Sequence, residues 1–234
     1  MKKGTILVSK NGPYLVSGSL PLGTEIAEVG KEGEPERWVK GKQYPDRENY
    51  ALCRCGESKT RPFCDGSHVS AGFDGTETAS REPYSKQAEK LEGPAIDLRD
   101  AESLCSGARF CHGKGNVWNL VSRARDPESK TAAINEVCNC PAGRLVAYDK
   151  KSGKPIEAAY SPSLSLIEDP QAKSSGPIWV KGGVTVESEN GRGYETRNRM
   201  TLCRCGRSCN KPLCDGSHIG MRFNDGDESL DKRH

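Results

Sequence analysis

The sequence predicts an α+β protein, mostly β with short helices, in which two copies of one small module flank a middle domain. The windows CRCGESKTRPFCDGSH, at 53–68, and CRCGRSCNKPLCDGSH, at 203–218, are identical at 11 of 16 positions. Such self-similarity indicates a duplicated structural unit. The segment between the copies carries different helix and hairpin signals. The domain boundaries expected from this pattern are 1–92, 93–170 and 171–234.

Short runs rich in β-branched or aromatic residues, bounded by Gly and Pro, predict strands in both copies. In chain order they are Thr5–Ser9, Tyr14–Ser17, Tyr50–Leu52, Ile178–Lys181 and Met200–Leu202. The two short runs that end in Leu lead directly into the repeated windows. The first copy is longer by 14 residues, which fall in the charged, Gly-rich stretch around 30–46.

The middle domain has one clear helix start, at Asp126 and Pro127. Asp is a preferred N-cap residue, and Pro is favoured at the first helical position. The apolar face of this helix extends to about Val137. Arg144–Tyr148 and Pro155–Tyr160, joined by a KKSG turn, then predict a β-hairpin.

Two segments are predicted as linkers between these parts. Lys86–Pro94 is charged and ends in Gly-Pro, and Ser161–Gly176 carries Pro, Ser and Gly. Hydrophobic residues make up only 34% of the chain, so we do not expect one thick core.

The net charge and the cysteine content limit the classes of function that this protein can have. Lys and Arg (35) minus Asp and Glu (32) give a net charge of +3, which supplies no bulk attraction for nucleic acid or acidic lipid. The chain shows no signal peptide and no apolar run near the ~18 residues of a membrane span. We therefore expect a soluble, cytoplasmic protein. In a reducing compartment, the 11 Cys are interpreted as metal ligands or free thiols.

Each repeated window has the pattern Cys-x-Cys-x8-Cys-x3-His and so offers four metal ligands. Cys64 and His68 are four residues apart, which predicts that both point to one side of a short helix. Asp65 is the expected cap of that helix, and Gly56 allows the turn after the first Cys pair. The candidate ligands are Cys53, Cys55, Cys64 and His68 in the first window and Cys203, Cys205, Cys214 and His218 in the second.

The spacing leaves two kinds of site open. Zinc sites usually place paired Cys two to four residues apart, and a one-residue gap makes it harder to surround one ion. A [2Fe-2S] cluster has two irons, so Cys-x-Cys can bind one while Cys and His bind the other. Mixed Cys/His ligation of this cluster is chemically known. The spacing favours the cluster over zinc, and buried or disulfide-bonded Cys are the least expected reading.

Both windows resemble the CDGSH iron–sulfur domain family, to which mitoNEET belongs, including Ser58 and Ser208. The resemblance implies two [2Fe-2S] clusters, with Cys53 and Cys55 on the inner iron of the first, Cys64 and His68 on its outer iron, and the same roles in the second copy. It also implies a β cap shared by two strand-exchanged protomers. Because this chain carries both copies, we expect an intramolecular pseudo-dimer and a monomer, with Tyr14–Ser17 and Ile178–Lys181 each completing the other half.

The middle segment resembles a divergent single-cluster ferredoxin-like segment through LCSGARFCHGKGNVWNLV and CNCPAGRLV. Its cysteines are Cys105, Cys111, Cys138 and Cys140. Their spacing is far from that of compact bacterial ferredoxins. A third metal site, reduced thiols and a disulfide all stay open.

For four other residues near these motifs, an ordinary structural explanation stands beside a functional one. Arg54 and Arg204 lie between ligands, where they offset an anionic site or are simply solvated charges. His112 is expected at the surface rather than on a metal. Cys209 replaces Lys59 of the first copy and needs no function.

These features predict an iron–sulfur protein that acts in electron transfer, in pH-sensitive cluster transfer, or in both. Imidazole can take up a proton and leave a metal, so a His ligand couples pH to cluster retention. The alternative is a zinc-binding protein-interaction module. An enzyme is not expected, because no nucleophile–base pair, phosphate loop or dinucleotide fingerprint is present. The expected partner is an unidentified redox or cluster-acceptor protein, and neither nucleic acid nor membrane.

Overall fold

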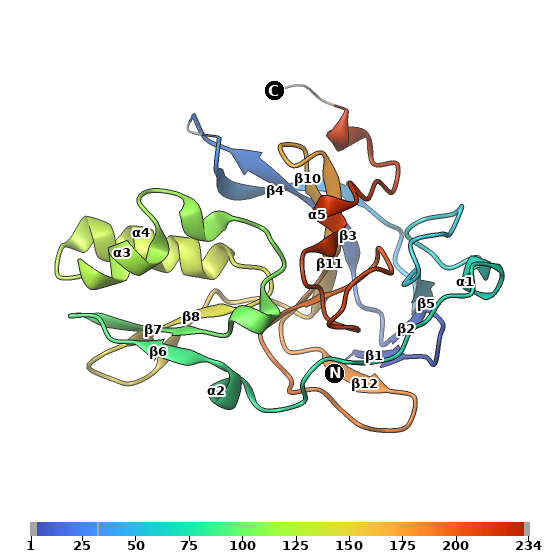
Figure 1. Cartoon of the computed structure of the whole chain (residues 1–234), viewed down its shortest axis with the longest axis horizontal. Helices are drawn as coiled ribbons and strands as arrows, with labels where there is room; N and C mark the ends of the chain where they lie inside the picture. The colour runs from blue at the N-terminus through green and yellow to red at the C-terminus, as the bar shows by residue number, and fades with distance from the viewer. Residues whose placement is uncertain (1–3, 32, 232–234) are drawn as a thin grey trace.

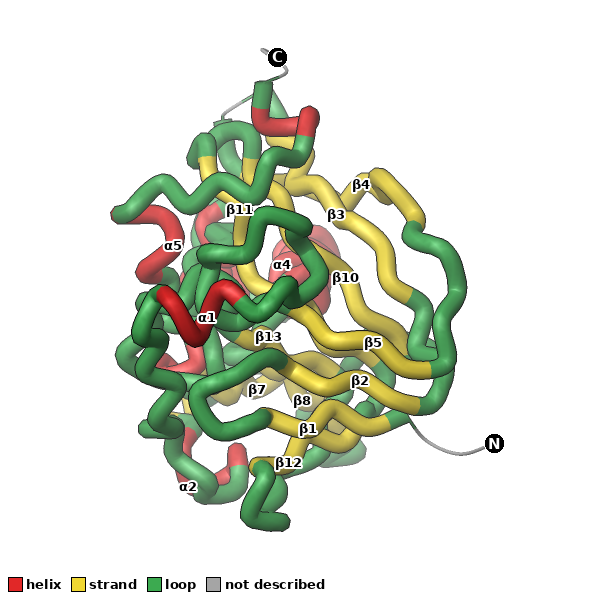
Figure 2. The backbone as a smooth tube through the Cα atoms, turned by 90° about the vertical axis from the view of Figure 1, so that its right-hand side faces the viewer, coloured by secondary structure: helices red, strands yellow, loops and turns green. Residues whose placement is uncertain are grey.

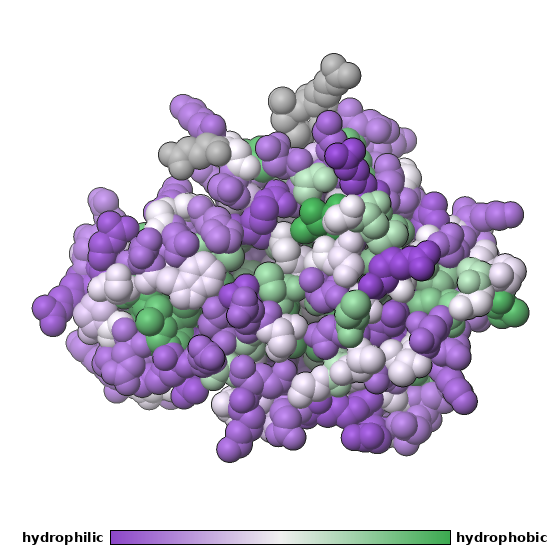
Figure 3. Space-filling model, viewed as in Figure 1, coloured by the Kyte–Doolittle hydropathy of each residue, from purple (hydrophilic) through white to green (hydrophobic). Residues whose placement is uncertain are grey.

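The computed structural model describes residues 4–31 and 33–231 (Figure 1). Strands within this part of the chain form three sheets, and the helices are few and mostly short. The expected α+β class, mostly β, is confirmed. No described helix is both long and apolar enough to cross a bilayer. The face shown in Figure 3 is largely hydrophilic, with small separate hydrophobic patches.

The first sheet takes one of its four strands from the second repeat. Its order is β12 (Thr185–Ser188), β1 (Thr5–Val8), β2 (Tyr14–Ser17) and β5 (Asn49–Leu52), which follow one another in Figure 2. β1 pairs in parallel with β12, and the other pairs are antiparallel. Alternate residues of β1 and β2 are buried, as expected when one face of a sheet covers a core.

The second sheet mirrors this arrangement. Its order is β13 (Arg199–Leu202), β11 (Ser174–Lys181), β10 (Ser163–Asp169), β3 (Leu22–Val29) and β4 (Pro35–Gln43). β10 pairs in parallel with β3, which comes from the first repeat. One hydrophobic core joins the two sheets and includes Ile6, Tyr14, Leu166 and Ile178.

The middle segment has its own sheet and its own core. The sheet contains β6 (Glu89–Leu91), β7 (Ile96–Asp100), β8 (Leu145–Asp149) and β9 (Pro155–Ile156), and α3 (Val117–Ser122) and α4 (Pro127–Asn139) pack on it. The remaining helices are α1 (Ser67–Ser70), α2 (Tyr84–Gln87), α5 (Ser217–Gly220) and the 3-10 turns η1 (Glu102–Leu104), η2 (Phe110–His112) and η3 (Glu228–Leu230).

Local signals predicted several elements correctly. The helix that follows Asp126 is confirmed, since the Asp126 carboxylate accepts a 2.8 Å hydrogen bond from the Ser129 N–H and Pro127 is its first residue. The predicted strands are also present, with small differences at their ends. The hairpin formed by β8 and β9 is confirmed, although its second strand is much shorter than expected.

Both predicted linkers are wrong. Residues 86–94 contain β6, a fully exposed edge strand whose composition, EKL, carries no apolar alternation. Residues 161–176 contain β10 and the start of β11. β10 lies between β11 and β3, and its Ser165, Glu168 and Asp169 are buried. The Gly-rich stretch around 30–46 contains all of β4, which pairs with β3.

The strands expected to cross between the repeats are also wrong. Tyr14–Ser17 pairs with β1 and β5, both of its own repeat. Ile178–Lys181, the end of β11, pairs with β10 and β13. The strands that cross are β3 and β12, each of which adds to the free edge of the other sheet. Neither has a sequence signal for its partner, because a parallel pairing between distant segments leaves no local turn motif.

Candidate metal centres

The structure brings the predicted ligands together two by two. In the first ligand loop (53–68), the Sγ atoms of Cys53 and Cys55 are 3.7 Å apart, and Cys64 Sγ is 3.5 Å from His68 Nδ1. In the second ligand loop (203–218), the equivalent separations are 3.7 Å and 3.4 Å. Within the described residues, no three such side chains converge closely enough to hold one ion.

These separations fit pairs of ligands on tetrahedral metals. Bonds of about 2.3 Å to sulfur and about 2.0–2.1 Å to nitrogen place two sulfurs about 3.8 Å apart, and sulfur and nitrogen about 3.6 Å apart. Both values agree with the distances in the two loops. The donor set therefore suits two metal ions in each loop, one on each pair.

A turn, rather than a helix, places Cys64 beside His68. α1 begins only at Ser67, so Cys64 precedes it and the expected helical spacing is wrong as the cause. The Asp65 carboxylate accepts hydrogen bonds from the N–H groups of Ser67 (3.0 Å) and Lys59 (2.8 Å) and so fixes this turn, but Asp65 is not the N-cap residue that was expected. Gly66, with φ of 87°, is the N-cap residue and completes the reversal. The second loop repeats this arrangement, and the peptide bonds before Pro62 and Pro212 are both cis.

Backbone N–H groups point at the ligand sulfurs. Gly66 and Gly216 each donate to the Cys two residues earlier, at 3.4 Å. Glu57 donates to Cys55, also at 3.4 Å. Hydrogen bonds of this kind stabilise negative charge on sulfur and are one means by which proteins adjust iron–sulfur potentials.

The two ligand loops touch each other through backbone. A Cβ atom placed on Gly56 would lie 2.7 Å from the carbonyl oxygen of Cys205, and one on Gly206 would overlap the carbonyl of Cys55. Tyr14, which is fully buried, donates from its hydroxyl to the carbonyl oxygens of Cys203 (2.7 Å) and Pro212 (3.0 Å). The first repeat therefore supports the loop of the second directly.

Comparison with family models identifies these loops. The model of the iron-binding zinc finger, CDGSH type, matches residues 11–69 and 175–219. The chain carries two CDGSH regions in tandem. The model of a divergent 4Fe-4S mono-cluster segment matches residues 91–150, between the two CDGSH regions. Neither the curated proteins nor the solved structures contain a match.

The arginine inside each CDGSH loop is buried, which excludes the reading as a solvated charge. Arg54 donates to the carbonyl oxygens of Ser9 (3.1 Å) and Gly75 (2.6 Å). Arg204 forms ion pairs with Glu168, at 2.6 Å, and with Asp225. Burial raises the pKa of Glu168 to about 7, while the Arg204 charge opposes that rise.

The outer ligand pairs of the CDGSH protein differ in exposure. Cys64 and His68 are partly exposed, whereas Cys214 and His218 are 2% and 5% exposed. Burial, together with the Arg204 charge, lowers the pKa of His218 to about 4. Burial also raises the pKa of the Cys214 thiol well above its ordinary value. A metal that binds Cys214 must therefore displace a strongly held proton.

The middle cysteines are all partly buried and free of disulfides. Burial and the charges of Cys140 and Cys105 raise the pKa of Cys111 to about 12, so these three thiols share one region. Cys138 faces elsewhere, with its Sγ 3.9 Å from the Ile156 carbonyl oxygen. Within the described residues, no three of these cysteines converge closely enough to hold one metal ion.

His112 and Cys209 both lie at the surface of the protein. His112 is exposed and lies 6.0 Å from the ring of Trp118. Cys209 is exposed, and its N–H donates to the Asp215 carboxylate as Lys59 donates to Asp65.

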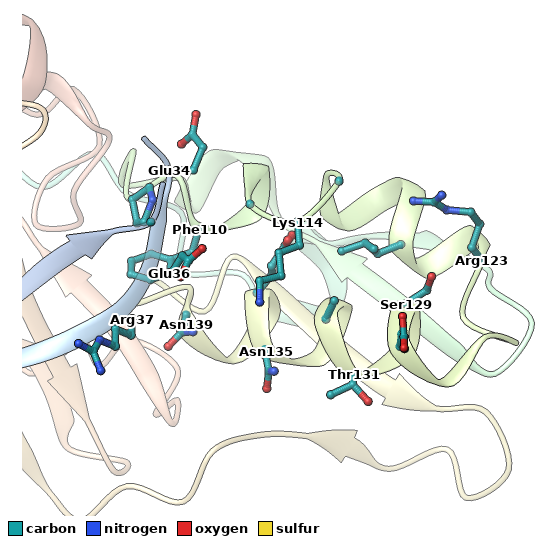
Figure 4. A pocket seen from close by; sticks show the side chains of 18 of the residues that line it. Glu34, Glu36, Arg37, Phe110, Lys114, Arg123, Ser129, Thr131, Asn135 and Asn139 are labelled. Carbon is teal, nitrogen blue, oxygen red and sulfur yellow. The ribbon is translucent and has the colours of Figure 1, made fainter. Parts of the chain in front are cut away.

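A pocket that the sequence did not predict lies between the β3–β4 hairpin and the helices of the middle segment (Figure 4). Arg37, Lys114 and Asn135 are among the residues that line it. Glu136 also lines it and is 7% exposed, and burial raises its pKa to about 7. None of the eight CDGSH ligands lines this pocket, so it is separate from the candidate metal centres.

Proposed function

We propose that this chain binds two [2Fe-2S] clusters and acts in one-electron transfer, in cluster transfer, or in both. Each cluster would be held by three Cys and one His, as predicted from the two windows. The observation that carries the proposal is the pairing of ligands at 3.4–3.7 Å within each loop. Two pairs, each suited to one tetrahedral ion, form the donor set of a two-iron group rather than of a single zinc ion.

The chain's own residues have distinct tasks in this proposal. Cys53, Cys55, Cys203 and Cys205 are buried and would hold the inner irons away from water. The N–H groups of Gly66 and Gly216 stabilise thiolate charge at the outer positions. Such clusters exchange single electrons when bound and need no substrate pocket. We therefore propose a non-catalytic role whose partner is a redox or acceptor protein rather than nucleic acid.

We infer further that the two repeats form an intramolecular pseudo-dimer with a shared, strand-exchanged β cap. The support is reciprocal: β3 of the first repeat pairs with β10, and β12 of the second pairs with β1, both in parallel. The exchange fills one edge of each sheet within the same chain, which leaves that edge unavailable to another copy.

A monomer follows from this arrangement. Size-exclusion chromatography with light scattering should give a mass near 25.4 kDa, because both halves of the cap belong to one chain. A stable dimer that persists on dilution would contradict the intramolecular exchange.

Iron and acid-labile sulfide measured per chain, on protein purified without oxygen, test the cluster assignment. Two [2Fe-2S] clusters give about four irons and four sulfides and a red-brown protein with visible absorption. Replacing the four middle cysteines, Cys105, Cys111, Cys138 and Cys140, by Ser should leave this count near four. A colourless protein with zinc and no sulfide would overturn the proposal, and iron lost only in the fourfold variant would reveal a third cluster.

A further inference from the structure

A loop of the middle segment covers the outer ligand pair of the second repeat. Asn210 donates from its side-chain amide to the Ser103 carbonyl oxygen at 2.9 Å. A Cβ atom on Gly107 would lie 2.5 Å from Ile219 Cδ1, and one on Gly216 would lie 3.8 Å from Gly107 N. From the other side, Ser174 donates to the His218 carbonyl oxygen at 2.9 Å. These contacts account for the burial of Cys214 and His218.

The equivalent face of the first repeat is open. Val69, which corresponds to Ile219, is 77% exposed, the largest exposure among the large hydrophobic side chains described. A Cβ atom on Gly66, which corresponds to Gly216, would meet nothing within 4 Å. Figure 1 shows α1 at the outer edge of the molecule, while α5 lies nearer to the middle segment.

From this difference we infer that the two sites have separate tasks: the first is an exchange site that incoming thiol ligands can reach, and the second retains its cluster. The inference rests on the proposed function and assigns cluster transfer to one site. An acceptor must bring its own ligand to the outer metal position before the resident ligand leaves. Of the two outer pairs, only Cys64 and His68 are partly exposed and so accessible to such a ligand.

The exchange step is a ligand substitution without electron transfer. Cys64 and His68 would hold the outer position of the bound group, and the sulfur of the incoming thiol would take the place of the His68 imidazole there. The proton of the incoming thiol passes to the released imidazole, so charge and atoms balance. At the second site, the loop around residues 103–107 packs against Asn210, Gly216 and Ile219, beside the buried outer pair.

The test follows the loss of visible absorbance in oxidised protein mixed with dithiothreitol and EDTA. We expect two phases of similar amplitude whose rates differ at least tenfold. Single-site variants assign the phases: Cys64→Ser should remove the fast phase, and Cys214→Ser should remove the slow one. Iron and sulfide counts on each variant confirm which cluster remains.

A paired substitution tests whether the cover is the cause. Gly107→Ala adds a methyl group against Ile219 and should speed the slow phase several-fold. Gly153→Ala is the control, because Gly153 has a similar positive φ (67° against 75°) and its Cβ would meet nothing within 4 Å. Asn210→Ala is a second, milder test of the same loop, because it removes only the hydrogen bond to the Ser103 carbonyl.

Several outcomes would overturn the inference. Equal rates for both clusters, or a fast phase that survives in Cys64→Ser, would show that the outer pairs do not differ in access. A slow phase unaffected by both Gly107→Ala and Asn210→Ala would remove the cover as the cause. Absence of iron and sulfide from the wild-type protein would overturn the proposed function as well, and so is distinguished from these results.

Discussion

Gly56→Ala should lower the thermal unfolding midpoint by roughly 5–15 °C, corresponding to about 2–5 kcal/mol. Two costs add at this position. Gly56 has φ of 80°, where an L side chain is strained. Its new methyl carbon would also lie 2.7 Å from the carbonyl oxygen of Cys205, which is backbone and has no rotamer to change. The two ligand loops would have to separate, and circular dichroism against temperature measures the result.

Gly191→Ala is the matched control for strain alone. Gly191 has φ of 79°, and a Cβ atom there would meet nothing within 4 Å. Its midpoint should fall by only about 2–4 °C, from about 1 kcal/mol of conformational cost. If both variants lost the same amount, the contact between the loops would contribute nothing to stability.

Arg204→Met should destabilise the protein by about 3–5 kcal/mol, because it leaves buried carboxylates without their cation. The side chains of Glu168 and Asp225 are 0% and 7% exposed, and both pair with Arg204. Arg54→Met is the comparison within the same chain. It removes a guanidinium that bonds carbonyl oxygens at Ser9 and Gly75, so we expect about 1–3 kcal/mol. Urea unfolding of both variants gives the two values.

The pH dependence of the unfolding free energy tests whether Glu168 causes the loss of stability in Arg204→Met. Folding raises the pKa of Glu168 to about 7, so its stabilising contribution is complete below its ordinary pKa and is lost as pH rises through 7. Without Arg204 the pKa rises further, so the loss continues to higher pH. The deficit relative to wild type should therefore be larger at pH 8 than at pH 6. Adding Glu168→Gln should recover part of it, and no recovery would contradict a role for Glu168.

Features formed by residues close together in the chain could be predicted from the sequence. The repeated window predicted two CDGSH regions, which the family comparison confirms. Asp126 and Pro127 predicted the start of α4, because capping acts between residues a few positions apart. Tyr14–Ser17 matched β2 to the residue, since its alternating burial and flanking Gly and Pro are local properties. The candidate ligands are a local feature too, because all four in each window lie within 16 residues.

Only the tertiary structure decided which strands meet and which ligands are covered. The segment that contains β10 is predicted as a linker because it carries Pro, Ser and Gly, yet neighbouring strands on both sides bond it. The parallel pairings of β3 with β10 and of β12 with β1 join segments more than 130 residues apart, and no local motif indicates such a pairing. Two similar windows also gave one partly exposed and one buried outer pair. Exposure depends on what packs against a loop, and the residues that cover Cys214 and His218 come from the middle segment and β11.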